Sequence, residues 1–187
     1  GSPQHLRAAC EASLKRLKLE QIPLYYMHQP DPNVPYEDSI GELASLQKAG
    51  KIRHIGISNV TAAQLATARS VVKVVAVQNR YNILSRQADE ILATCERERI
   101  AFIPFSPLGG RSAAAINAED ARLTALKSLA ADKHIDLAQV VLAWLLARSP
   151  VMLAIPGTTK VEHLEDNVAA GKVHLTQEEM ERIEKIG

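Results

Sequence analysis

Polar side chains and glycines follow five short apolar runs of the chain, and these positions hold the residue types best suited to chemistry. The five endings are His28, Ser58–Asn59, Gln78–Asn79, Phe105–Ser106 and Pro156–Thr158. A histidine can transfer a proton or orient an oxygen atom, and hydroxyl and amide groups can hydrogen-bond a ligand. One polar ending carries little weight, because strands often run into polar turns. Five endings on one face of a parallel sheet predict a binding or catalytic site.

The last ending also indicates a kind of ligand. Gly157, Thr158 and Thr159 lead directly into a predicted helix, and Lys160 adds a positive charge. Backbone N–H groups and the helix dipole at a helix N-terminus favour an anion such as a phosphate. The same residues could equally form an ordinary helix cap, so this segment alone leaves both interpretations open.

The elements that must position these residues alternate along the whole chain. The predicted strands are Ile22–Met27, Ile52–Ile57, Val74–Val77, Ala101–Phe105 and Met152–Ile155. The predicted helices are Pro3–Leu17, Tyr36–Gly50, a short helix after Thr61, Ser85–Arg99, Ala118–Lys133, Asp136–Arg148, Thr159–Ala170 and a last helix after Thr176. Capping boxes are predicted where Thr61, Thr159 and Thr176 are each followed three residues later by Gln or Glu.

The alternation of strands and helices predicts an α/β fold with parallel strands in a single domain over residues 1–187. The strands are nearly continuous apolar runs, which is typical of parallel strands covered on both faces. A doubly wound open sheet and a (β/α) barrel both fit this pattern. The chain has no GxGxxG or Walker sequence, which favours the barrel. We therefore expect an incomplete barrel of the TIM type, with about five β/α units and extra C-terminal helices.

Composition narrows the function classes. The chain has 187 residues, 47% of them hydrophobic, and a net charge of +1 with acidic and basic residues interspersed. No basic block favours nucleic acid, and no charge run or long apolar segment favours a membrane. Cys10 and Cys95 lie in helical patterns among apolar neighbours, so we expect buried free thiols. Together these features predict a cytoplasmic protein.

Five motifs carry a resemblance to a known family. They are LYYMHQPDP (Leu24–Pro32), IRHIGISN (Ile52–Asn59), VQNRYN (Val77–Asn82), IPFSPLGG (Ile103–Gly110) and IPGTTKVEHLEDN (Ile155–Asn167). In this order and spacing they resemble the aldo-keto reductases over essentially the whole chain. The resemblance implies an eight-stranded (β/α) barrel that binds NADPH, less often NADH, and reduces aldehydes and ketones to alcohols by hydride transfer.

The resemblance also implies roles for the matching positions. His28 matches the catalytic histidine that orients the substrate carbonyl. The positions that match the cofactor site are Ser58, Asn59, Gln78, Phe105, Ser106, Leu108, Gly157, Thr158, Lys160, His163, Asp166 and Asn167. The first three match residues that hydrogen-bond the nicotinamide carboxamide, and Phe105 matches the aromatic residue that stacks on the nicotinamide ring.

The remaining cofactor positions match segments along the phosphates. Ser106 and Leu108 match the loop along the pyrophosphate, and the positions from Gly157 to Asn167 match the segment around the adenosine and its 2′-phosphate. Many relatives have an arginine where His163 stands. A neutral imidazole binds phosphate less well than a guanidinium, so NADH remains open as a cofactor.

One part of the family pattern has no counterpart here. In the family a tyrosine is the general acid, its pKa is lowered by a lysine that pairs with an aspartate, and all three lie on the first three strands. The matching motifs of this chain begin at the helix before the fourth strand, so none of its residues matches the three. Tyr25, Tyr26 and Tyr81 are expected to serve packing. The chain alone is therefore expected to be catalytically incomplete.

Three hypotheses for function follow. The first is the NADP(H)-dependent reductase, with a small carbonyl substrate and with self-association through open barrel edges. The alternative is a non-catalytic nucleotide-binding or regulatory module of the same fold. The third, a metal-dependent barrel hydrolase, is disfavoured because His28 and Asp31 have no further ligands at metal spacing, so no metal is expected.

Overall fold

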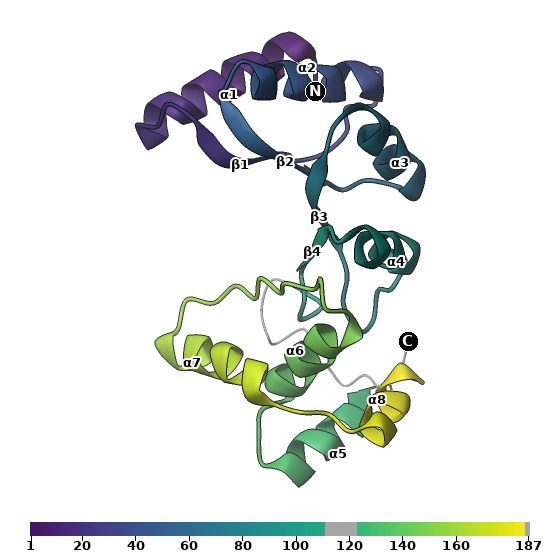
Figure 1. The fold of residues 1–187 in the computed structure, drawn as a ribbon. Helices are drawn as coiled ribbons and strands as arrows, with labels where there is room; N and C mark the ends of the chain where they lie inside the picture. Colours follow the sequence, from purple (N-terminus) through teal and green to yellow (C-terminus); the bar gives the residue numbers. More distant parts are fainter. Residues whose placement is uncertain (111–122, 186–187) are drawn as a thin grey trace. The chain divides into compact units, whose positions relative to one another are not determined.

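A computed structural model describes residues 1–110 and 123–185. Its elements are α1 (Pro3–Leu17), β1 (Ile22–Met27), α2 (Tyr36–Lys48), β2 (Ile52–Ser58), α3 (Ala62–Val71), β3 (Val74–Arg80), α4 (Asp89–Glu98), β4 (Ala101–Phe105), α5 (Thr124–Lys133), α6 (Leu137–Arg148), α7 (Val161–Ala169), a short 3-10 helix η3 (Ala170–Lys172) and α8 (Gln177–Glu184). The start of the helix predicted from Ala118 lies outside the described residues. The alternating order confirms the predicted α/β class (Figure 1).

The chain divides into two compact units. The N-terminal unit comprises Gly1–Asn79 and Ala93–Ala101, and the C-terminal unit comprises Arg80–Leu92 and Phe102–Gly187. The strands form a sheet in the order β1-β2-β3-β4. β1 pairs in parallel with β2, and β2 pairs in parallel with β3 with an irregularity between Ile55 and Gly56. Parallel pairing places the carboxyl ends of neighbouring strands at one edge, as the sequence predicts.

Apolar residues at helical and strand spacing build the core of the N-terminal unit. In this unit α1 lies beside α2 and α2 beside α3, and α2 packs on β2 (Figure 1). Ile40, Leu43 and Leu46 of α2 are fully buried, as are Ile55 and Ile57 of β2. Burial of each such side chain stabilises the fold by about 1.5–3 kcal/mol. This packing fixes the strands whose ends carry the predicted site.

Gly56 is required by the close approach of β1 and β2. It is paired with Tyr26 across the two strands. A Cβ atom at position 56 would lie 2.4 Å from a ring carbon of Tyr26, which is closer than side-chain atoms can come. The half-buried Tyr26 ring therefore occupies the space that any other residue would need.

An aromatic cluster forms the core of the C-terminal unit. Tyr81, Phe102 and Trp144 are fully buried. The Tyr81 ring stacks on Trp144 with centroids 6.2 Å apart and meets Phe102 edge-on at 5.7 Å. Trp144 belongs to α6, a helix that is apolar nearly all round and is buried from Gln139 to Leu145. The sequence interpretation of Tyr81 as a packing residue is confirmed.

The fifth predicted strand, Met152–Ile155, is reduced to one parallel bridge between Met152 and Phe102. The Phe102 N–H donates to the Val151 carbonyl at 2.8 Å, and the Leu153 N–H donates to the Phe102 carbonyl at 2.9 Å. The next bond of a parallel ladder would require an N–H from residue 104, which is Pro104. Proline has no backbone donor, so the ladder ends after one bridge.

Two further expectations concern helices and thiols. The helix expected from Ser85 begins at Asp89, because residues 82–85 form a tight turn. In this turn the Asn82 N–H donates to the Ser85 carbonyl at 3.1 Å, and the Ser85 N–H donates to the Asn82 carbonyl at 3.0 Å. Cys10 and Cys95 are buried free thiols, as predicted. Burial raises the pKa of the Cys95 thiol to about 12. Within residues 1–110 and 123–185, the helices are too short or too polar to cross a membrane.

Candidate cofactor site

In the N-terminal unit, hydrogen bonds join the carboxyl ends of β1, β2 and β3. The Ser58 hydroxyl donates to the Gln78 carbonyl at 2.7 Å, and the Asn59 N–H donates to the same oxygen at 3.0 Å. The Asn59 side-chain amide donates to the His28 carbonyl at 2.9 Å and to the Ser58 hydroxyl at 3.1 Å. The structure therefore brings together His28, Ser58, Asn59 and Gln78, which the sequence places on one edge.

Asn59 has an unusual backbone conformation. Its φ angle is 57°, in the left-handed region that only a few per cent of residues other than glycine adopt. Asparagine tolerates this region better than most residues because its short polar side chain can hydrogen-bond locally. The two bonds donated by its amide supply that local compensation. Asn59 is thus held at one position and orientation at the strand ends.

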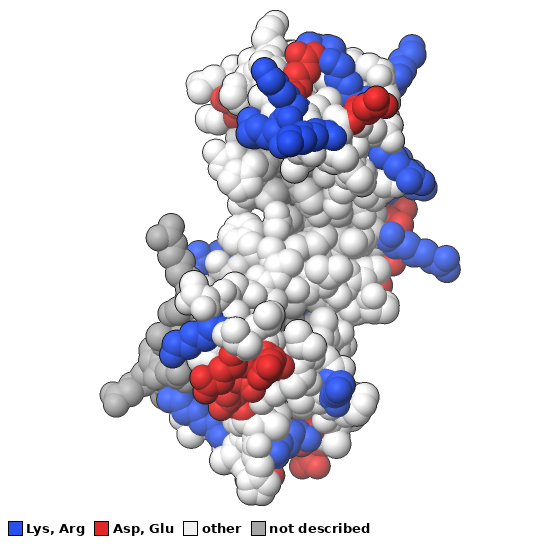
Figure 2. Space-filling model, turned by 90° about the vertical axis from the view of Figure 1, so that its left-hand side faces the viewer, with Lys and Arg blue, Asp and Glu red and all other residues white. Residues whose placement is uncertain are grey.

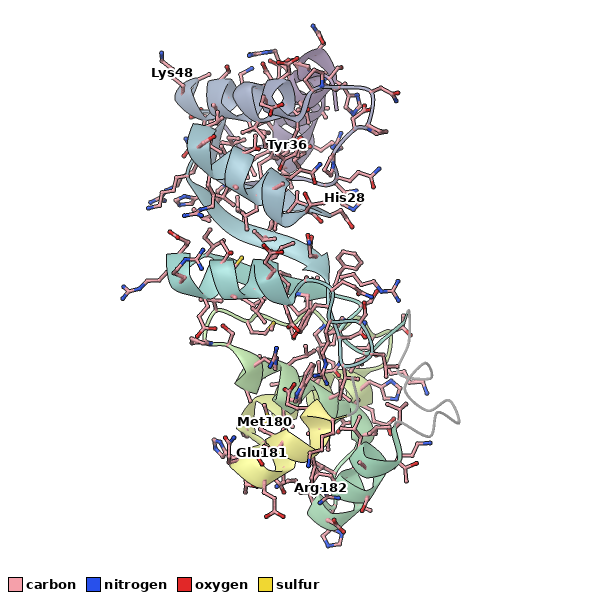
Figure 3. The ribbon with its side chains drawn as sticks, turned by 90° about the vertical axis from the view of Figure 1, so that its right-hand side faces the viewer. His28, Tyr36, Lys48, Met180, Glu181 and Arg182 are labelled. Atoms are coloured by element: carbon pink, nitrogen blue, oxygen red, sulfur yellow. The ribbon has the colours of Figure 1, made fainter. Side chains whose placement is uncertain are left out.

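Gln78 and His28 present side chains that the surrounding protein leaves available. Gln78 is half-buried, and its side-chain amide makes no hydrogen bond to the residues that the structure describes. His28 lies directly after β1 and is exposed (Figure 3). A half-buried amide with donors and an acceptor can pair with another amide, and an exposed imidazole can contact a ligand oxygen.

Asn79 fixes the loop beside these residues, a role that the sequence does not reveal. Its side-chain oxygen accepts from the Val60 N–H at 3.1 Å, and its side-chain nitrogen donates to the Val60 carbonyl at 2.7 Å. Asn79 is 8% exposed, so both bonds are shielded from water. Its position after Gln78 was visible in the sequence, but its partner lies on a different loop.

In the C-terminal unit, a tight turn follows β4. Ser106 has φ 52° and Gly109 has φ 84°, and the Gly109 N–H donates to the Ser106 carbonyl at 2.9 Å. Phe105, half-buried at the end of β4, and Leu108, 6% exposed, lie on either side of Ser106. Gly109 supplies a positive φ at no steric cost. We refer to residues 106–109 as the Ser106 turn.

The Ser106 turn lines a cavity of about 180 Å³. Its lining residues are Ser106, Pro107, Leu108, Gly110, Ile155, Pro156 and Gly157. Gly157 has open space where a Cβ atom would stand, so a ligand could approach the backbone there. The cavity thus combines two segments, the one after β4 and the one before α7, that the sequence assigns to one cofactor.

The segment before α7 differs from its predicted cap. The Thr158 hydroxyl accepts from the Lys160 N–H at 3.1 Å, and the helix begins at Val161 with Lys160 as its N-cap. Thr159 is thus too far upstream to cap, and the predicted box with Glu162 does not form. The first turn of α7 has no side-chain cap, so its N–H groups can face an anion. These features fit a phosphate group.

The remaining predicted residues lie on or beside α7. Gly157, Thr158, Lys160 and His163 are exposed, while Asp166 and Asn167 are half-buried. An exposed lysine ammonium can pair with a phosphate without displacing an internal partner. The structure therefore groups the predicted adenosine-side residues at the start and middle of one helix.

Burial makes the four tyrosines weaker acids than a free tyrosine. Burial and the hydrogen bond to Asp89 raise the pKa of Tyr81 to about 12. Burial also raises the pKa of Tyr25, Tyr26 and Tyr36. A general acid works best when its pKa lies near the operating pH. The tyrosines therefore serve packing better than catalysis.

The chain is similar to known proteins over its whole length. It is 40% identical over 187 residues to an uncharacterized oxidoreductase of Schizosaccharomyces pombe, covering 100% of this chain and 59% of that protein. It is 38% identical over 191 residues to pyridoxine 4-dehydrogenase of Escherichia coli, covering 99% of this chain and 64% of that protein. The chain therefore spans about three fifths of the length of these relatives.

Solved structures show the same architecture. A thermostable aldo-keto reductase in complex with the inhibitor epalrestat superposes with a TM-score of 0.89 at 30% identity, covering 100% of this chain and 67% of that one. An aldo-keto reductase of Klebsiella pneumoniae in complex with NADP and acetate gives 0.82 at 26% identity, covering 97% and 64%. These neighbours are (β/α)8 barrels, of which this chain covers a part. The profile of the aldo/keto reductase family matches residues 1–187, and the chain, with its parallel strands and polar carboxyl ends, belongs to that family.

Proposed function

We propose that this chain is the cofactor-holding part of an NADP(H)-dependent reductase of aldehydes and ketones. The observation that carries the proposal is the Gln78 side chain. It is half-buried, has no partner among the described residues and stands where Ser58 and Asn59 are fixed. An amide in this position matches the hydrogen-bonding pattern of a carboxamide, the polar group of a nicotinamide ring.

In the N-terminal unit, Ser58, Asn59 and Gln78 hold that carboxamide, and His28 orients the oxygen of the carbonyl substrate. Because His28 is exposed and directly follows β1, its ring can reach a ligand without moving core residues. The cofactor supplies the hydride when bound. The contribution of these residues is orientation, which lowers the entropy cost of reaction.

In the C-terminal unit, the Phe105 ring offers a face for the nicotinamide, and Ser106 and Leu108 lie along the pyrophosphate. Gly157, Thr158, Lys160, His163, Asp166 and Asn167 surround the adenosine and its 2′-phosphate. Lys160 and the uncapped first turn of α7 support a phosphate there. NADPH is the preferred cofactor, with NADH second because His163 replaces a stronger phosphate binder. NADP in the Klebsiella pneumoniae relative supports this choice.

The chain by itself supplies cofactor binding but no general acid. No residue matches the tyrosine, lysine and aspartate of the family, and the pKa of every tyrosine is raised. Loss of a general acid lowers the rate typically by about 10²–10⁴-fold. We therefore expect reduction of 4-nitrobenzaldehyde by NADPH, followed at the NADPH absorbance, to be near background. Robust turnover that His28→Ala abolishes would contradict this expectation.

A non-catalytic nucleotide-binding or regulatory module is the second candidate, because the cofactor contacts proposed above need no proton donor. A restoration experiment separates the two. The segment of Escherichia coli pyridoxine 4-dehydrogenase that this chain does not cover, expressed separately and mixed with the chain, would restore turnover if the chain is part of a reductase. A complex that forms but stays inactive would favour the module.

The surface charge and the buried thiols support a small-molecule substrate and a cytoplasmic location. The face shown in Figure 2 carries both acidic and basic side chains and no extended basic surface. This distribution supports a small-molecule substrate rather than nucleic acid. The buried free thiols support a reducing compartment, and we propose the cytoplasm.

A further inference from the structure

The Ser106 turn contains backbone conformations that need support. A residue other than glycine with φ near 52° is strained, and such conformations persist only where the surroundings fix them. The Ser106 carbonyl accepts the Gly109 N–H, which closes the turn. This single bond lies beside a cavity, so it alone gives the turn little protection from opening.

The Asn82 side chain, on a different loop, gives the Ser106 turn a second hydrogen bond. Its side-chain nitrogen donates to the Ser106 carbonyl at 3.0 Å, so that oxygen accepts two hydrogen bonds. Asn82 is 1% exposed. Its side-chain oxygen accepts from the Leu84 N–H at 3.0 Å, which leaves the nitrogen facing Ser106.

The loop that carries Asn82 is itself held firmly. Asn82 and Ser85 exchange two backbone hydrogen bonds, and the Tyr81 N–H donates to the Phe105 carbonyl at 3.5 Å. Next in the loop, Arg86 pairs with Glu184 of α8 at 2.6 Å. Asn82 therefore projects from a fixed support onto the strained turn.

We propose that Asn82 is a positioning residue of the cofactor pocket. It acts through the Ser106 carbonyl and holds the Ser106 turn in the shape that lines the cavity with Pro107, Leu108 and Gly157. The inference rests on the proposed function, because the ligand it serves is the pyrophosphate part of NADP(H). Asn82 itself touches no cofactor, and its effect is on binding geometry.

Two variants separate this role from general support of the fold. Asn82→Asp keeps the oxygen that accepts from Leu84 but replaces the donor to Ser106 by an oxygen that repels the carbonyl. Ser106→Gly removes the strain of the left-handed conformation. If Asn82 acts by holding the strained turn, Ser106→Gly in the Asn82→Asp background restores part of the lost protection of the Gly109 amide. Ser39→Ala, which removes a buried hydroxyl bonded to Gly1 in the N-terminal unit, is the control for lost stability.

The first measurement needs no cofactor. Hydrogen exchange of the Gly109 amide, followed by NMR, reports the turn directly. One hydrogen bond contributes about 1 kcal/mol, so Asn82→Asp should speed this exchange about three- to tenfold, and Ser39→Ala should leave it unchanged. Titration with NADPH, followed by its fluorescence, should show a similar loss of affinity in Asn82→Asp.

These experiments distinguish a failure of the Asn82 proposal from a failure of the proposed NADPH binding. Unchanged exchange of Gly109 in Asn82→Asp would overturn the proposal, as would faster exchange with unchanged NADPH affinity. Failure of the double variant to regain protection of the Gly109 amide would also overturn it and assign Asn82 to its own loop. If the unaltered chain does not bind NADPH, the proposed function fails, and the proposed cofactor role of Asn82 fails with it, whatever the exchange data show.

Discussion

Lys160 allows a residue-level test of cofactor preference. Its ammonium group is exposed at the N-cap of α7, next to helix N–H groups without a side-chain cap. If it faces the 2′-phosphate, Lys160→Ala should weaken NADPH binding about three- to tenfold, the value of an exposed charge pair of about 1 kcal/mol, and leave NADH binding nearly unchanged. Parallel fluorescence titrations with both cofactors measure the difference.

Lys172→Ala is the matched control for Lys160→Ala, because Lys172 is another exposed lysine of the same unit, in η3. It should change neither affinity. Equal losses of NADPH and NADH affinity in Lys160→Ala would mean that Lys160 attracts both cofactors equally and does not contact the 2′-phosphate.

The sequence identifies the residues proposed to bind a ligand better than the residues that support them. Ser58, Gln78 and Phe105 stand at strand ends, and that position alone marks them. Asn79 and Asn82 lie beside them in sequence, but their partners Val60 and Ser106 are 19 and 24 residues away. Such pairings depend on how two loops meet, which local patterns do not encode.

Among the elements, α8 carries a carboxylate, that of Glu184, that accepts hydrogen bonds from three side chains. Glu184 accepts from Trp144 Nε1 at 3.1 Å, from Arg86 at 2.6 Å and from Arg148 at 3.3 Å. The carboxylate is 35% exposed, so water screens part of these interactions. Glu184→Ala would leave two guanidinium groups and an indole N–H with fewer partners. We expect a loss of about 1–3 kcal/mol in the free energy of unfolding, measured by urea denaturation.

Glu181→Ala on the same helix gives the comparison (Figure 3). Glu181 is exposed and bonds only to Gln177 among the described residues. Its loss should change stability by no more than about 0.5 kcal/mol. Similar effects of the two variants would show that Glu184 does not anchor α8.

Elements with purely local signals are predicted correctly. The capping boxes at Thr61 and Thr176 form as expected, since each box involves residues within one turn. The box at Thr159 does not form because α7 begins at Val161 with Lys160 as its N-cap, and the strand at Met152–Ile155 fails because Pro104 on another strand lacks a donor. Competition between neighbouring residues and between strands decides these cases.

At the scale of the whole molecule, uncovered apolar surface predicts self-association. In the N-terminal unit β1 is an edge strand, and Leu24 is 40% exposed. In the C-terminal unit, Val161, Leu164 and Val168 form an apolar stripe along α7 and are 73%, 53% and 68% exposed. Unpaired edges and exposed apolar side chains favour contact with another chain.

Light scattering over a range of micromolar concentrations tests this expectation. We expect the average mass to rise with concentration. Leu164→Lys, which places a charge on the stripe, should reduce the rise, while Glu162→Lys on the same helix should not. A monomer at every concentration would mean that the open edges are satisfied within one chain.

We expect residues 1–187 to bind NADP(H) on their own. Calorimetric titration of the unaltered chain with NADPH measures it directly. We expect saturable heat at one site per chain, with lower affinity than a full-length relative such as Escherichia coli pyridoxine 4-dehydrogenase, and further weakening by Gln78→Leu. No heat of binding at millimolar NADPH, from a chain shown to be folded by its urea transition, would contradict it.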